Sequence, residues 1–156
     1  MISGKPSVLK KTTFSFVDFF EGQTQAWGIF EDRFGKIRLH LSINMNGSWS
    51  RDNFVLEENF YYNDGRQENR KWLIKNGKCD QFLATCDDCI GQAIGQIIEN
   101  EIKMRYHFRL KMRKHVLHVY FIDRIIKLDN YRAVNRATMY KWGIKLGELS
   151  LFFEKK

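Results

Sequence analysis

Turn signals recur along this chain at intervals of about ten residues, and short runs of apolar and aromatic residues lie between them. The clearest signals are Arg33–Lys36, Asn63–Gly65 and Asn76–Gly77. Asn-Gly and Asp-Gly pairs supply the positive φ angles that tight hairpins require. Strands at this spacing, joined by hairpin turns, are typical of a β-sandwich or a β-barrel. The spacing therefore predicts a nearly all-β, antiparallel fold.

About ten consecutive strands are predicted. Asn46–Gly47 is expected to end the second one. Ile90–Ile102 also has helical spacing, but Gly91 and Gly95 favour a strand, because each would cost a helix about 1 kcal/mol. In a strand, a glycine marks a bend or a point where another side chain crosses closely. The predicted strands are Gln25–Asp32, Ile37–Met45, Asn53–Tyr62, Arg66–Lys75, Cys79–Cys86, Asp88–Ile98, Ile102–Lys111, His115–Leu128, Arg132–Lys141 and Ile144–Glu154.

Only Ser15–Phe20 has a helical pattern, with three phenylalanines on one side. Ser15 or Thr13 would cap this helix, and Gly22 would end it. In a barrel, such a helix would close one open end. The length of 156 residues is that of one domain, and residues 1–13 are expected to form a flexible lead.

The loop Asn63–Gly65 sets the register of one hairpin, because a three-residue loop with a left-handed glycine pairs Tyr62 with Arg66. Counting back by twos gives the pairs Phe60–Glu68, Glu58–Arg70 and Leu56–Trp72. This face is mainly apolar and is therefore expected to point inward. An inward Glu58–Arg70 pair is costly unless both partners are satisfied, so it is either structural or functional.

The formal net charge of +8 is compatible with nucleic acid or an anionic surface as a partner, but positive residues alternate with acids along the chain. The densest basic stretch, Lys103–Lys114, is interpreted as a solvated strand pair with its turn. The alternative is a basic patch on which Arg105, Arg109, Arg113 and Lys114 gather, so nucleic acid is the less favoured partner.

Enzyme and metal motifs are absent from the sequence. Cys86 and Cys89 have a zinc-like spacing, but no second pair completes four ligands, and ordinary reduced thiols are expected. The histidines form no metal motif, and no nucleophile elbow or phosphate-binding glycine loop is present. We therefore predict no catalytic residue, no metal and no cofactor.

Location is inferred from two further absences. No apolar run has the length of a membrane span, and residues 1–20 do not form a signal peptide. A cytoplasmic location is therefore expected for the chain as written.

Several segments together resemble a bacterial family catalogued as domain of unknown function 3833. They are Phe19–Gly22, Ala26–Phe30, Asp32–Gly35, Leu56, Glu58, Phe60, Tyr62, Gly65, Arg70, Trp72, Asp87–Asp88, Gly91, Ala93, Gly95, Asn100, Tyr106, Asp123, Asn135–Met139, Lys141, Gly143 and Gly147–Glu148. The resemblance implies an up-and-down, lipocalin-like (calycin-type) barrel without an established activity. Members of the family often carry an N-terminal lipoprotein signal, which this chain lacks, so the cell envelope is the alternative location.

The expected function is binding of an apolar or lipid-like molecule, plausibly a fatty acid, inside this barrel. The candidate ligand-binding residues are Glu58, Arg70, Trp72, Trp27, Phe60, Asp123 and Arg136. Asn135 and Arg136 are neighbours on one strand, so only one of them can point inward. Two alternatives remain: an enzyme that acts on a lipid-like substrate with Glu58 and Asp123, and a barrel without a cavity that binds a protein or a nucleic acid.

Overall fold

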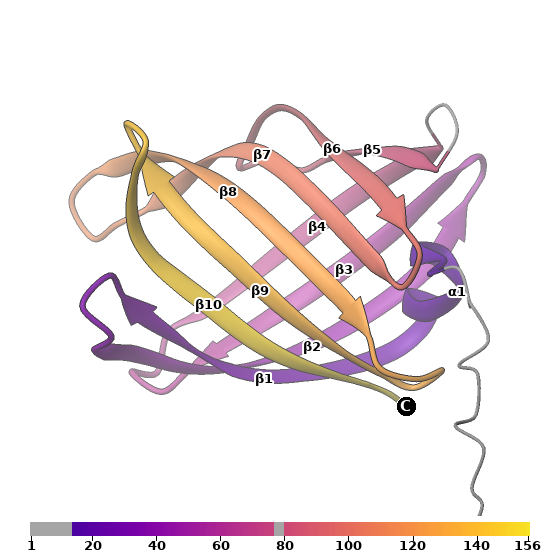
Figure 1. Cartoon of the computed structure of the whole chain (residues 1–156), viewed down its shortest axis with the longest axis horizontal. Coiled ribbons are helices and arrows are strands. Elements are labelled where there is room, and N and C mark those ends of the chain that lie inside the picture. The colour runs from indigo at the N-terminus through magenta and orange to yellow at the C-terminus, as the bar shows by residue number, and fades with distance from the viewer. Residues whose placement is uncertain (1–13, 77–79) are drawn as a thin grey trace, which may run out of the picture.

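The computed structural model describes residues 14–76 and 80–156 as one closed antiparallel β-barrel preceded by a short helix (Figure 1). Each strand pairs with its neighbours in sequence, and β1 closes the barrel against β10. The elements are α1 Phe16–Phe20, β1 Gly22–Asp32, β2 Ile37–Ser50, β3 Asn53–Tyr62, β4 Gln67–Asn76, β5 Gln81–Thr85, β6 Cys89–Ile98, β7 Glu101–Lys111, β8 Val116–Lys127, β9 Arg132–Lys141 and β10 Ile144–Lys155. The predicted lead over residues 1–13, Cys79 and the turn at residue 77 lie outside the described residues.

Strand β7 illustrates why these segments form a barrel wall. Ile102, Met104, Tyr106 and Phe108 are buried, and the basic residues between them face outward. This alternation places apolar side chains inside and charged ones in water. The basic stretch Lys103–Lys114 thus lies on β7 and in the β7–β8 connection, which confirms the predicted strand and turn.

Strand β2 differs from its prediction at Asn46–Gly47. The strand continues through this pair to Ser50, and the turn follows at Arg51, which has a φ of 56°. Gly47 is needed for a different reason: the carbonyl group of Phe20 and the ring of Phe54 leave no room for a Cβ. The Asn-Gly pair therefore marks a close approach of two chain segments.

Strand β6 confirms the choice of a strand over a helix for the segment around Gly95. The ring of Phe82 lies directly over Gly95, where a Cβ would collide with it. Gly91 has a φ of 72°, and the pairing with β7 shifts between Ile90 and Ile94. One glycine thus marks a crossing side chain and the other marks an irregularity of the strand.

The β3–β4 hairpin has the predicted register. Gly65 has a φ of 87°, and the Tyr62 N–H donates to the carbonyl oxygen of Arg66 at 3.0 Å. The pairs Phe60–Glu68, Glu58–Arg70 and Leu56–Trp72 are all observed.

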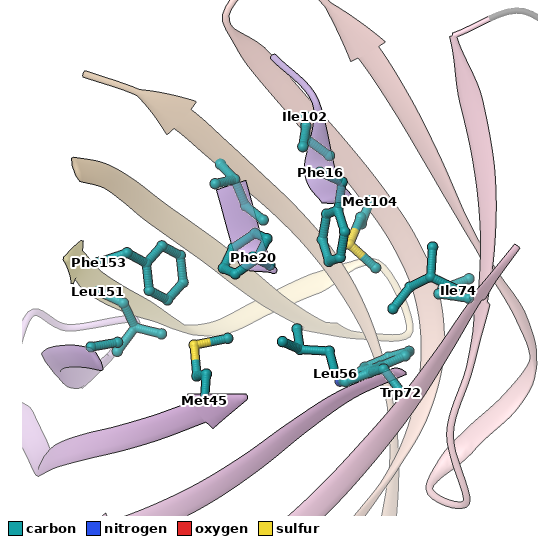
Figure 2. Close-up of a cluster of buried hydrophobic side chains, with 14 of the residues drawn as sticks. Phe16, Phe20, Met45, Leu56, Trp72, Ile74, Ile102, Met104, Leu151 and Phe153 are labelled. Atoms are coloured by element: carbon teal, nitrogen blue, oxygen red, sulfur yellow. The ribbon is translucent and has the colours of Figure 1, made fainter. Parts of the chain in front are cut away.

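Helix α1 closes one end of the barrel (Figure 1). The predicted cap is present, because the Asp18 N–H donates to the hydroxyl oxygen of Ser15 at 3.3 Å. Phe16 and Phe20 point inward among side chains from β2, β3, β4, β7 and β10 (Figure 2). Ring centroids of Phe20 and Phe153 lie 5.6 Å apart, which is typical of packed aromatic pairs. The opposite end of the barrel, where β1 turns into β2 and β9 into β10, has no such helix in the described part of the chain.

Candidate functional site

A cavity of about 370 Å³ lies inside the barrel. Phe16 and Phe20 of α1 form its floor, and it extends to Arg38, Arg66 and Lys111, which are exposed at the opposite end. The cavity therefore opens at that end, which we call the mouth. Its volume lies within the range of about 300–1,000 Å³ that is common for small-molecule pockets. The alternative of a barrel without a cavity is wrong.

Five polar side chains on five strands line this cavity among apolar ones. They are Glu58 on β3, Arg70 on β4, Tyr106 on β7, Asp123 on β8 and Asn135 on β9. Each occupies an inward position of its strand and lies between the apolar floor and the mouth. A buried polar group that lacks a partner costs about 1–3 kcal/mol, so the contacts of this polar cluster decide its role.

Arg70 is a largely buried cation that lacks a complete set of hydrogen bonds. Its Nη1 lies 3.9 Å from Glu58 Oε2 and its Nη2 lies 3.6 Å from Glu68 Oε2, both longer than a hydrogen bond. The guanidinium lies 4.7 Å from the ring centroid of Phe60 and 4.6 Å from that of Phe108, in cation–π geometry. Among the described residues, no group accepts a hydrogen bond from Arg70 Nε, which is buried. Arg70 is thus held in place but incompletely paired.

Asp123 is the second incompletely paired charge. Its Oδ2 accepts a hydrogen bond of 3.0 Å from the Tyr106 hydroxyl, and its buried Oδ1 has no partner in the described chain. Burial, reinforced by the charge of Glu58, raises the pKa of Asp123 to about 7, although Tyr106 and Arg70 act against this. Burial also raises the pKa of Glu58, against the opposing effects of Arg70 and Trp72. Near neutral pH, the Asp123 carboxyl group can therefore hold a proton and donate a hydrogen bond.

Asn135 adds an acceptor to the same wall. Its side chain is buried, and its Oδ1 has no hydrogen-bond donor within the described residues. Arg70, Asp123 and Asn135, which all line the cavity, thus each have one buried polar atom without a partner among the described residues.

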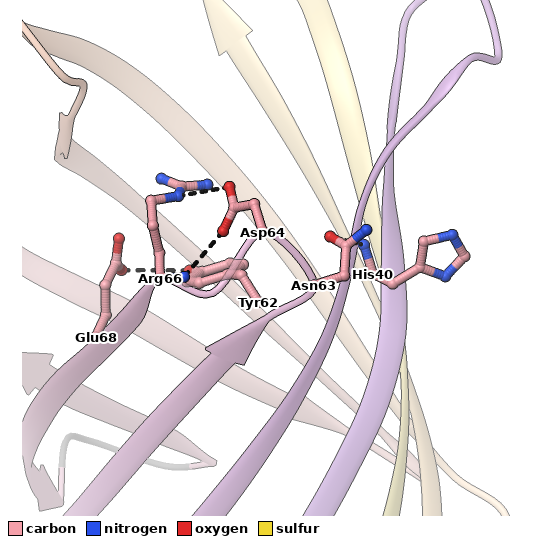
Figure 3. A network of polar contacts seen from close by, with 6 residues as sticks. All are labelled: His40, Tyr62, Asn63, Asp64, Arg66 and Glu68. Carbon is pink, nitrogen blue, oxygen red and sulfur yellow. Dashed lines mark hydrogen bonds and ion pairs between the residues drawn. The ribbon is translucent and has the colours of Figure 1, made fainter.

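The β3–β4 turn fixes the mouth beside this cluster (Figure 3). Arg66 and Asp64 form an ion pair of 2.8 Å, and the Tyr62 hydroxyl donates to Glu68 Oε2 at 3.3 Å. On the other side, the His40 N–H donates to the side-chain oxygen of Asn63 at 3.1 Å. Burial and the Glu68 charge raise the pKa of Tyr62, so its hydroxyl stays protonated. Tyr62 and Glu68 thus line the cavity together with Arg70, whose Nη2 lies 3.6 Å from Glu68 Oε2.

The structure brings together five of the predicted ligand-binding residues: Glu58, Phe60, Arg70, Trp72 and Asp123 all line the cavity. Trp27 and Arg136 do not. Trp27 stacks on Phe152 on the outer face and is 40% exposed, because its neighbour Ala26 takes the inward position. Arg136 pairs with Glu148 outside the barrel, because Asn135 is the inward member of that pair.

Tyr106 and Glu68 are cavity residues that the sequence-based prediction omits. For Tyr106 a signal exists, since it continues the inward series Ile102, Met104 and Phe108 on β7. Glu68 could have been inferred from its pairing with Phe60, but a charged residue near a turn is more often solvent-exposed.

The cysteines and the acidic residues show no sign of a metal or redox centre. Cys86 and Cys89 are free, and burial raises the pKa of Cys86 to about 11 and also that of Cys89. Over residues 14–76 and 80–156, no group of three or more His, Cys, Asp or Glu side chains could hold a metal ion. None of the helices in these ranges has the length and apolar character needed to cross a membrane.

Comparison with known proteins agrees with the fold. The model of the family "Protein of unknown function (DUF3833)" matches residues 5–155. No curated protein matches the chain. Among solved structures, the S-type phycobiliprotein lyase CPES from Guillardia theta superposes with a TM-score of 0.67, at 5% identity and over 90% of both chains. The predicted lipocalin-like, ten-stranded barrel with a short N-terminal helix is therefore confirmed.

Proposed function

The chain belongs to the DUF3833 family, and from its cavity we propose that the protein binds one small amphipathic anion, such as a fatty acid, inside the barrel. The observation that carries this proposal is Arg70, a guanidinium without a complete set of hydrogen bonds on the wall of a mainly apolar cavity. A carboxylate accepts two parallel hydrogen bonds from a guanidinium, which Glu58 does not do at 3.9 Å. A bound carboxylate would therefore provide what the chain itself leaves out.

The charge of the polar cluster permits such an anion. The pKa of Asp123 is raised to about 7, so uptake of a proton by this carboxyl group offsets the negative charge that a ligand brings. The protonated carboxyl group then donates a hydrogen bond to the ligand, and the Asn135 amide lies on the same wall. Binding of the anion is thus coupled to uptake of a proton.

The orientation of the ligand follows from the walls of the cavity. Between the polar cluster and α1 the lining is apolar, with Met45, Leu56, Ile74 and Phe153 around Phe20 (Figure 2). Toward the mouth the lining includes charged side chains of β2, β4 and β7. An apolar tail would therefore lie toward α1 and gain about 0.8 kcal/mol for each methylene group that it buries. The volume suits one single-chain molecule rather than a whole two-chain phospholipid.

Mass spectrometry of the native protein, followed by solvent extraction, tests this proposal directly. We expect a co-purifying monocarboxylic amphiphile, and a fluorescent fatty acid should bind with one-to-one stoichiometry. The variant Arg70→Met keeps most of the side-chain volume and is measured beside Glu58→Gln/Arg70→Met, because loss of one partner leaves the other charge unpaired whereas loss of both is often nearly neutral. It should weaken binding by at least about tenfold, since a charge-assisted hydrogen bond contributes about 1.5–3 kcal/mol.

Lys71→Met is the matched control, because Lys71 lies next to Arg70 on β4 but faces outward and pairs with Glu57. It should leave binding unchanged. Equal affinity of a neutral alcohol and of the carboxylate of the same chain length would contradict the role of Arg70. An absence of binding by folded wild-type protein would remove the proposal.

A second candidate function rests on Asp123. A carboxyl group with a pKa near 7, hydrogen-bonded to Tyr106 inside a cavity, is suited to proton transfer, so the barrel could also be an enzyme that acts on a lipid-like substrate. The similar solved structure is described as a lyase, which makes this candidate worth testing. Incubation of the extracted ligand with the wild type and with Asp123→Asn, followed by mass spectrometry, should show conversion only by the wild type. An unchanged ligand would leave simple binding.

A further inference from the structure

Trp142 combines an exposed indole with a backbone conformation that is unfavourable for a bulky residue. The pairing of Lys141 with Ile144 leaves only Trp142 and Gly143 in the β9–β10 turn, with φ values of 51° and 76°. A turn of this type favours Asn, Asp or Gly at its first position, and a bulky residue with positive φ is a rare outlier. The indole is 88% exposed. Since neither the turn nor the core requires this tryptophan, a partner outside the chain is the remaining reason for it.

Two other turns of the mouth also expose a large apolar side chain. Phe34 is 80% exposed in the β1–β2 turn, and Met112 is 48% exposed in the β7–β8 turn. All three turns project from the end of the barrel opposite α1 (Figure 1). Exposed large apolar side chains at the tips of turns around one opening are the pattern expected of insertion into a membrane interface, where tryptophan is enriched.

Positive charge surrounds these three side chains. Arg33 lies 4.7 Å from the ring centroid of Phe34, and Lys141 Nζ lies 4.6 Å from that of Trp142. The cations of the mouth are Arg33, Lys36, Arg38, Arg66, Lys111, Arg113, Lys114, Lys141 and Lys145.

The acids of the mouth do not balance these cations. Those acids are Glu31, Asp32, Asp64, Glu68, Asp87, Asp88 and Glu148, and Glu148 pairs with Lys145 at 3.1 Å. Asp32 and Asp64 are each engaged by an arginine at 2.8 Å, and Asp88 lies 3.4 Å from Lys111. Elsewhere at this end, Arg33, Lys36, Arg113 and Lys114 form no ion pair within the described residues. The mouth therefore has an excess of positive charge.

Among residues 14–76 and 80–156, the opposite end of the barrel does not share this charge. Its described turns also expose apolar side chains, since Tyr131 is 65% and Leu128 57% exposed. There, however, the described acids match the described cations. The acids are Asp18, Glu21, Asp52, Asp80, Glu99, Glu101, Asp129 and Glu154, and the cations are Arg51, Lys75, Arg124, Lys127, Arg132, Lys155 and Lys156. Apolar exposure alone thus does not distinguish the two ends, and charge does.

We propose that the mouth of the barrel docks on an anionic lipid bilayer, with Phe34, Met112 and Trp142 inserted among the headgroups and the surrounding cations on the lipid phosphates. A membrane surface attracts such cations by about 1 kcal/mol each and accepts the aromatic tips, whereas nucleic acid would leave those tips in water. Docking turns the opening of the cavity toward the lipid, so an amphipathic molecule would enter or leave without crossing water. The docking itself does not depend on what the cavity holds.

Vesicle co-sedimentation of the full chain tests the docking. The vesicles contain phosphatidylcholine alone or an equal mixture of phosphatidylcholine and phosphatidylglycerol, and strong binding is expected only for the mixture. The variants Arg113→Gln and Lys114→Gln should each weaken binding about fivefold. Trp142→Asn should weaken it about tenfold without unfolding, because asparagine suits the turn better than tryptophan. Wild-type tryptophan fluorescence should shift to shorter wavelength on mixed vesicles, and the Trp142→Asn variant should lose this shift.

Tyr131→Asn at the opposite end is the matched control and should bind vesicles as the wild type does. Equal binding to neutral and anionic vesicles, or unchanged binding by Trp142→Asn, would overturn the proposal. So would binding of duplex DNA that depends on Arg113 and Lys114 while vesicles are not bound, since the cations would then serve a nucleic acid. Arg70→Met should still bind vesicles, which separates a failure of docking from a failure of the ligand proposal.

Discussion

Replacement of Asp123 by Asn should stabilise the protein at pH 8 and leave its stability almost unchanged at pH 4. Burial, the largest cause, raises the pKa of Asp123 from its ordinary value of 3.8 to about 7. The folded protein therefore binds a proton that the unfolded chain has released between these two pH values. Stability accordingly falls as the pH rises through this window, and the cost of the charge is complete above pH 7.

The size of the effect follows from the two pKa values. A tenfold change in proton affinity corresponds to about 1.4 kcal/mol, so a shift from 3.8 to about 7 corresponds to about 4 kcal/mol at pH 8. Asparagine has nearly the same shape and can still accept the hydrogen bond from Tyr106. We therefore expect a gain in the free energy of unfolding of roughly 2–4 kcal/mol at pH 8, and of less than about 1 kcal/mol at pH 4.

Urea unfolding at several pH values between 4 and 8, followed by tryptophan fluorescence, measures this difference. Asp129→Asn is a control of opposite sign: its hydrogen bond with Arg132, the largest cause, lowers the pKa of this exposed carboxyl group. The stability that the Asp129 charge provides is present above the ordinary pKa and is lost as the pH falls through the lowered value. A constant difference between wild type and Asp123→Asn at all pH values, or a loss of stability at pH 8, would refute the reasoning.

Three further predictions concern the ligand, the mouth and the floor of the barrel. Affinity for a carboxylate ligand should fall as the pH rises above 7, toward tenfold for each pH unit if one proton is linked, and isothermal titration in two buffers of different ionisation enthalpy should detect that proton. Trp142→Asn should raise the free energy of unfolding by about 1 kcal/mol, because a positive φ strains a bulky residue; an unchanged denaturation midpoint would mean that the turn is unstrained. Gly47→Ala should lower the free energy of unfolding by roughly 1–3 kcal/mol, since a Cβ there meets the Phe20 carbonyl. Gly65→Asn in the exposed β3–β4 turn should lower it less, and thermal melts of both variants measure the difference.

The arrangement of the strands was predictable because it rests on local rules. Turn chemistry at Asn63–Gly65 determines one register, and that register alone is enough to place Glu58 opposite Arg70. The same rule misled at Asn46–Gly47, because a glycine that admits a close approach has the same sequence signature as a glycine that makes a turn.

The site was only partly predictable, because alternation along a strand defines two faces but does not show which face points into the barrel. Trp27 looks like a core residue by type, but the smaller Ala26 is the one that points inward. The Asn135–Arg136 pair posed the same choice, and the charged member lies outside, where it pairs with Glu148. The mouth was not predicted as a unit, since its turns are far apart in sequence and only closure of the barrel brings them to one end.

Closure itself has a consequence for how the protein is made. Strand β1 completes its second edge only with β10, so that Thr24 pairs with Lys155, the last residue of β10. On a ribosome, the other strands can form successive hairpins, whereas the second edge of β1 has no partner until β10, the last of the ten strands, is synthesised. Pairing over such a sequence separation slows folding, and the open intermediate exposes the edges of both terminal strands. Loss of a few C-terminal residues should therefore do more harm to this protein than their small number implies, by leaving a sheet that is able to pair with another copy of itself.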